Sequence, residues 1–91
     1  MLLELILGHV ARRLHNWTYR DVTDFLRESG FSFLEELGGS HQRWGKRGEN
    51  DEPDRIVEVS FRHDSNPVMT MKKMIRQSGI DEEAWIKWGS S

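Results

Sequence analysis

The stretch GGSHQRW, residues 38–44, combines residue types that could move a proton beside a phosphate. Gly38 and Gly39 are typical of a tight turn, and Ser40 leads from this supporting turn into His41. Histidine can act as general acid or general base because its side chain titrates near neutral pH. At the start of a strand it would project from a stiff element, beside backbone N–H groups that can bind phosphate. The same spacing also fits an exposed strand histidine without a role, so both interpretations stay open.

Other side chains could assist His41. His63 ends the apolar pattern RIVEVSFRH and is a candidate second proton carrier, although a structural role at the strand end fits it as well. Several cations could bind phosphates or could form a solvated charged surface. They are Arg43, Lys46 and Arg47 after the histidine, and Lys72, Lys73 and Arg76 further along the chain. Two separated histidines without matched carboxylates make a poor metal site, so we expect no metal and no other cofactor.

Composition excludes several classes of function. The 91 residues suffice for one small domain, and the absence of cysteine excludes a disulfide framework, a thiolate nucleophile and a thiolate zinc site. The formal net charge of −2 argues against a nucleic-acid binder that is basic over its whole surface. The apolar stretch at residues 2–7 is far shorter than the roughly 20 residues that span a membrane, and no basic residue precedes it as in a signal peptide. We therefore expect a cytoplasmic protein without a membrane partner.

Residues 3–14 are predicted to form a short amphipathic helix. Its apolar residues recur at helical spacing, and they are Leu3, Ile6, Leu7, Val10 and Leu14. A free apolar stripe would be adhesive, so we expect it to pack on the domain or on a second copy of the chain. The segment 1–17 is thus a predicted helical extension and a candidate homodimer interface.

Two longer helices carry recognisable end signals. Thr18 and Asp21 are placed as a capping box, and Gly30 is typical of the residue just past the end of this helix. Asn66 is the predicted cap of the second helix, with Pro67 as its first residue, and a glycine at position 79 ends it. The predicted core faces are Tyr19, Val22, Phe25 and Leu26 in the first helix and Val68, Met71, Met74 and Ile75 in the second. Met69 belongs either to this core or to a partner-facing surface, and a short last helix is expected from a cap at Asp81.

Three strands are predicted between these helices. They are FSFLEEL at 31–37, SHQRWG at 40–45 and RIVEVSFRH at 55–63, with a polar loop before the third. In the second strand His41 and Arg43 share one face, while Gln42 and Trp44 share the other. We expect Trp44 in the core rather than as a platform for nucleic-acid bases. In the third strand Val57, Val59 and Phe61 share a face.

This order predicts an α+β fold. Three strands joined in sequence pair antiparallel, and the two longer helices cover one face, which gives a two-layer α-β-β-β-α sandwich with an extra helix at each end. The expected organisation is an extension at 1–17, one domain at 18–85 and a tail at 86–91.

The ordered set TYRDVTDFLRESGF, GGSHQRW, FRH and MKKMIRQSGI resembles the HicA-type toxins, and the resemblance covers roughly residues 18–85. It implies the fold of double-stranded-RNA-binding domains and the activity of a small ribonuclease that cuts mRNA. It also implies a HicB-type antitoxin as partner and catalysis by His41, with Gly39 and Ser40 as the supporting turn.

The sequence therefore leaves two alternative hypotheses for the function. The first is a metal-independent endoribonuclease toxin with His41 as general acid or base, in which the 2′-OH attacks the neighbouring phosphorus. The second is a non-catalytic RNA-binding or protein-interaction module of the same fold. The GGSH turn favours the first function, and the negative charge favours the second.

Overall fold

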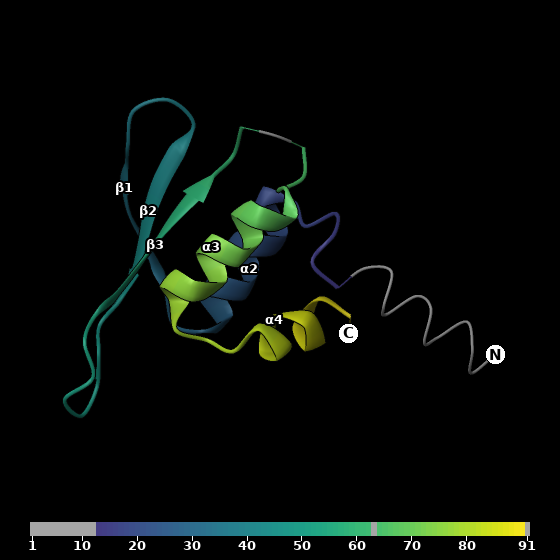
Figure 1. Cartoon of the computed structure of the whole chain (residues 1–91). Helices are drawn as coiled ribbons and strands as arrows, with labels where there is room; N and C mark the ends of the chain where they lie inside the picture. Colours follow the sequence, from purple (N-terminus) through teal and green to yellow (C-terminus); the bar gives the residue numbers. More distant parts are fainter. Residues whose placement is uncertain (1–12, 63, 91) are drawn as a thin grey trace.

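The protein folds as the predicted α+β sandwich (Figure 1). The computed structural model describes residues 13–62 and 64–90. Its elements are α2 (Tyr19–Glu28), β1 (Ser32–Glu36), β2 (His41–Lys46), β3 (Arg55–Ser60), α3 (Val68–Ser78) and α4 (Glu82–Gly89). The three strands form one antiparallel sheet in the order β1-β2-β3, and α2 and α3 lie on one side of it. The α-β-β-β-α order expected from the sequence is confirmed.

The predicted N-terminal helix falls mostly on residues 1–12, which lie outside the described residues, as do His63 and the homodimer interface built on that helix. Arg13 and Leu14 form a turn rather than helix, and Leu14 is buried in the core. Trp17 is fully buried as well, so the core begins before the boundary expected at residue 18. At the other end, α4 continues past residue 85 and buries Ile86.

The start of α2 forms as its sequence predicts. The Asp21 N–H donates to the Thr18 hydroxyl and the Thr18 N–H donates to the Asp21 carboxylate, both at 3.0 Å. This capping box satisfies backbone donors that the first turn of a helix leaves without partners. Val22, Phe25 and Leu26 turn their side chains into the core, as their spacing indicates.

The start of α3 differs from the prediction. Asn66 does not cap the helix; Pro67 takes the cap position and Val68 is the first helical residue. The Asn66 side chain instead donates to the Trp17 carbonyl at 3.2 Å, and its backbone N–H donates to the same oxygen at 2.7 Å. These bonds tie the segment before α2 to the segment before α3. Asp81 occupies the cap position of α4 as predicted, but its side chain forms no capping hydrogen bond.

Strand β2 occupies the centre of the sheet and alternates as predicted. Gln42 and Trp44 are buried under the helices, whereas His41 and Arg43 project from the opposite, outer face and are half-buried. In β3, Val57 and Val59 face the core. Phe61 lies beyond the end of β3 and is exposed, and its ring contacts that of Tyr19 of α2 edge-on, on the side of the sheet that Val57 and Val59 also face.

The apolar residues of β1 do not alternate strictly with polar ones, and the pairing of this strand gives the reason. Its register against β2 shifts between Phe33 and Glu35, where Leu34 is an extra residue. Such a bulge reverses the side-chain alternation of one strand. Phe33 therefore meets the buried ring of Trp44, while Leu34 and Glu35 both belong to the outer face.

The methionines of α3 divide into two environments. Met71 and Met74 are fully buried, as predicted. Met69 is 78 % exposed and does not belong to the core, because it precedes the buried face of the helix by half a turn. Its alternative place in a partner-facing surface stays a prediction. Within the described residues, no helix is long and apolar enough to cross a membrane.

Replacing Gly79 with alanine is expected to lower the free energy of unfolding by about 1–2 kcal/mol, the cost of holding an L-residue in the left-handed region. Gly79 ends α3 at φ 72°, and an added Cβ would lie 2.8 Å from the guanidinium carbon of Arg55. Gly38 is the matched control, since an added Cβ there meets nothing within 4 Å. Urea unfolding of both variants checks this, and equal midpoints for the two would contradict it.

Candidate functional site

His41 is the first residue of β2 and pairs in register with Ser60 of β3. The hairpin before it is closed by the Leu37 N–H, which donates to the His41 carbonyl at 2.9 Å, and Gly39 adopts φ 72° in the turn. The imidazole is 43 % exposed, and its Nδ1 lies 3.3 Å from Oε1 of Glu58. The side chain is thus open to solvent on one side and held at one ring nitrogen on the other.

A hollow of about 230 Å³ opens beside His41. It forms where the ends of β2 and β3 meet the first turns of α3. This meeting follows from α3 packing along β3, where the side-chain oxygen of Gln77 accepts from the Glu58 N–H at 3.0 Å. The hollow is lined by His41, Glu58, Ser60, Arg62, Asn66, Pro67, Thr70, Lys73 and Met74.

Two cations line the hollow with His41. Neither the Lys73 ammonium nor the Arg62 guanidinium forms a hydrogen bond or ion pair with another side chain among residues 13–62 and 64–90. A cation without a carboxylate partner remains available to an anionic ligand such as a phosphate. The hollow therefore combines a group able to transfer protons with two positive charges and the hydroxyls of Ser60 and Thr70.

The other predicted phosphate-binding residues lie elsewhere. Arg43 forms an ion pair with Glu35 on the outer face of the sheet. Lys72 pairs with Glu82 of α4 at 3.3 Å. Lys46 is at the far end of β2. Arg47 lines the hollow at the other end of the sheet, and Arg76 lines neither hollow. Of the six cations considered as phosphate ligands, only Lys73 lines the hollow beside His41.

The supporting turn of Gly39 and Ser40 positions His41 but does not itself form part of the candidate phosphate site. Gly39 and Ser40 do not line the hollow, so their backbone N–H groups are not part of its wall. The Ser40 carbonyl accepts from the Phe61 N–H at 2.9 Å, which extends the pairing of β2 with β3 by one residue. The turn thereby fixes where β2 begins and where His41 projects.

Glu58 and Arg62 are site residues that sequence reasoning missed. Alternation in RIVEVSFRH places Glu58 on the face opposite Val57 and Val59, which was visible in the sequence. Its approach to His41 depends on the register of β2 against β3, where Glu58 opposes Arg43 and is the diagonal neighbour of His41. No local pattern reports that register.

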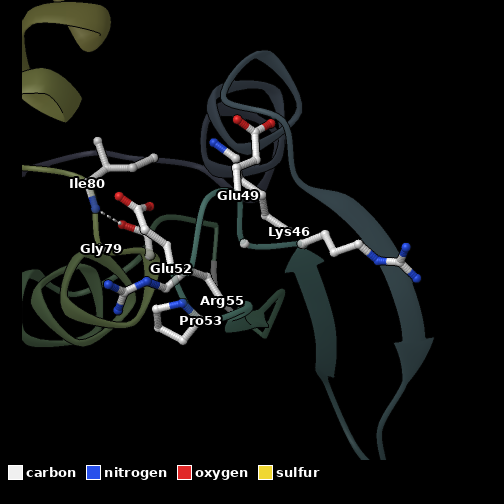
Figure 2. Close-up of a pocket in the computed structure, with 10 residues that line it drawn as sticks. Lys46, Glu49, Glu52, Pro53, Arg55, Gly79 and Ile80 are labelled. Atoms are coloured by element: carbon white, nitrogen blue, oxygen red, sulfur yellow. Dashed lines mark hydrogen bonds between the residues drawn. The ribbon is translucent and has the colours of Figure 1, made fainter.

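A second hollow of about 330 Å³ lies at the other end of the sheet (Figure 2). Figure 2 shows Lys46, Glu49, Glu52 and Arg55 around it, with Gly79 at the end of α3 closing one side. Its wall contains both cations and carboxylates, so it has no single charge preference. It shares no lining residue with the His41 hollow.

The residues that the structure describes include no group of three histidine or acidic side chains that could hold a metal ion. The fold and the hollow together define a small α+β domain with a histidine–glutamate pair near one end of its sheet. No family model matches the chain, and searches of curated proteins and of solved structures find no match either.

Proposed function

We propose that this protein is a metal-independent endoribonuclease that cuts mRNA, with His41 as general acid or general base. The observation that carries the proposal is the half-exposed imidazole of His41 in a hollow with the uncommitted cations Lys73 and Arg62. RNA cleavage without a metal needs this combination, because one group must move the proton while positive charge stabilises the phosphate in the transition state.

The chemistry at His41 follows from its free ring edge. As a base, the imidazole removes the proton of the 2′-OH, whose oxygen then attacks the adjacent phosphorus and displaces the 5′ oxygen. As an acid, it protonates that leaving oxygen. Lys73 and Arg62 would contact the phosphate oxygens in either case.

The motif set that resembles HicA-type toxins supports a biological setting for this activity. We propose a cytoplasmic toxin held inactive by a HicB-type antitoxin that covers the His41 hollow. Expression of the chain in a bacterial host should then arrest growth, and co-expression of its antitoxin should restore it. Growth that continues while folded protein accumulates would contradict the toxin assignment.

Digestion of a defined RNA by the purified protein tests the enzymatic proposal directly. Cleavage should proceed equally with and without EDTA, because His41 and the two cations require no metal. Products ending in a 2′,3′-cyclic phosphate would match attack by the 2′-OH. Cleavage that stops in EDTA would contradict the proposed mechanism.

Replacing Lys73 with alanine is expected to raise KM for RNA and to reduce the slope of log K against log salt by about one, the effect of losing one phosphate contact. Lys72→Ala is the matched control, because Lys72 is the neighbouring lysine but pairs with Glu82 outside the hollow. Binding titrations at several salt concentrations measure the slope. Equal slopes for the two variants would remove Lys73 from the phosphate site.

One observation favours the alternative of a non-catalytic interaction module. Leu34 and Ile56 are 50 % and 44 % exposed, and the side chains of both lie over Gly45 on the outer face of the sheet. Exposed apolar side chains grouped on one face are typical of a protein-binding surface. If RNA remains intact with the purified protein while a partner binds this face, the alternative is the correct function.

A further inference from the structure

We propose that Glu58 is a positioning residue that fixes the ring orientation and the tautomer of His41, an inference that rests on the proposed function. The Glu58 carboxylate lies 3.3 Å from Nδ1 of His41. An ionised carboxylate only accepts hydrogen bonds, so its position beside Nδ1 favours the neutral tautomer that carries the proton on that nitrogen. The lone pair then sits on Nε2, which is the nitrogen left to exchange a proton with the substrate.

No other cationic side chain among the described residues forms an ion pair with the Glu58 carboxylate. In the sheet register Arg43 stands directly opposite Glu58 and is the cation best placed to neutralise it. Arg43 instead binds Glu35 across the β1–β2 ladder. Among the described residues, His41 is consequently the one cationic or potentially cationic side chain that forms an ion pair with Glu58.

The backbone of Glu58 is also fixed. Its N–H donates to the side-chain oxygen of Gln77 at 3.0 Å, which ties this point of β3 to α3. Val57 and Val59 on either side are fully buried, so β3 cannot slide without moving the core. Glu58 therefore presents its carboxylate from a rigid element, as a residue that orients another must.

The cations and the carboxylate around His41 have different partners in the proposed mechanism. Lys73 and Arg62 face the hollow and would meet the phosphate, whereas Glu58 contacts Nδ1. A carboxylate beside the phosphate site weakens substrate binding by repulsion. Removing it should therefore leave KM unchanged or lower it, while the rate of the chemical step falls. Loss of a residue with a structural role alone would not lower the rate of the chemical step while leaving KM unchanged or lower.

The test uses the full chain and three variants. Glu58→Ala removes the acceptor, Glu58→Gln keeps an acceptor oxygen without the charge, and Glu52→Gln is the control for charge in a loop away from the hollow. Long-range ¹H–¹⁵N NMR at a pH where the ring is neutral reports the His41 tautomer in each. Cleavage of a defined RNA gives kcat and KM.

The wild-type and control proteins should show the Nδ1–H tautomer at His41, and Glu58→Ala should lose it. We expect kcat to fall about 10- to 100-fold in Glu58→Ala, as for outer partners that orient metal-bound histidines, and to fall less in Glu58→Gln. A wild-type His41 protonated on Nε2 overturns the role of Glu58 whatever the variants do. The expected tautomers in a protein that leaves RNA intact overturn the ribonuclease proposal and support the Glu58–His41 arrangement.

Discussion

Replacing His41 with alanine is expected to lower the rate of RNA cleavage by about 10²–10⁴-fold, the contribution of a general acid or base. The fold should survive, because the imidazole is 43 % exposed and its contact with Glu58 is a half-exposed pair. Such pairs are worth at most about 1 kcal/mol. The change in stability and the change in rate therefore differ enough to separate a catalytic role from a structural one.

His15→Ala is the matched control, since His15 is exposed and does not line the hollow. Both variants should unfold near the wild-type temperature, and only His41→Ala should lose cleavage and toxicity. A folded His41→Ala protein that still cuts RNA at the wild-type rate would end the assignment. Early unfolding of this variant would show that His41 has a structural role.

Replacing Trp85 with alanine is expected to lower the free energy of unfolding by about 3–5 kcal/mol, the range for large aromatic residues in cores. Trp85 is fully buried between α4 and the rest of the domain. The centroid of its ring lies 4.3 Å from the ring centroid of Phe25 and 5.7 Å from that of Trp17. Its indole N–H donates to the Ser78 hydroxyl at 3.3 Å. Alanine would leave a cavity and remove one hydrogen bond to that hydroxyl, which keeps its bonds to the Ile80 N–H and the Ile75 carbonyl.

A small domain has a total stability of about 5–15 kcal/mol, so this change removes a large share of it. The melting temperature should fall by at least about 12 °C, since each kcal/mol corresponds to roughly 4–8 °C at this size. Lys87→Ala is the control, because Lys87 is exposed in the same helix. Calorimetry or circular dichroism measures both variants. A similar melting temperature for the two would show that α4 is not part of the cooperative core.

Local patterns in the sequence determined the elements and much of their orientation. The capping box of Thr18 and Asp21 forms because both partners lie within one helical turn. The turn between β1 and β2 forms with Gly39 at φ 72°, a conformation that glycine adopts without strain. Alternation along β2 places Trp44 inside and His41 outside, since successive side chains of a strand point to opposite faces. These features need only neighbours in the chain.

Local patterns failed where distant segments compete for the same group. Asn66 has the composition of a helix cap, yet its side chain binds the Trp17 carbonyl, 49 positions away along the chain. The blurred phase of β1 reflects a bulge at Leu34 that becomes visible only against the register of β2. Burial of Trp17 and Ile86 extends the core beyond both expected domain boundaries.

The candidate site shows the same division. The sequence by itself singled out His41, because a histidine after a glycine turn is recognisable from residue types alone. Only the tertiary structure selected its neighbours: the β2–β3 register brings Glu58 to Nδ1, and the packing of α3 brings Lys73 to the hollow while Lys72 turns to Glu82. Register and helix packing are set by burial of the whole core, and no short stretch of sequence encodes them.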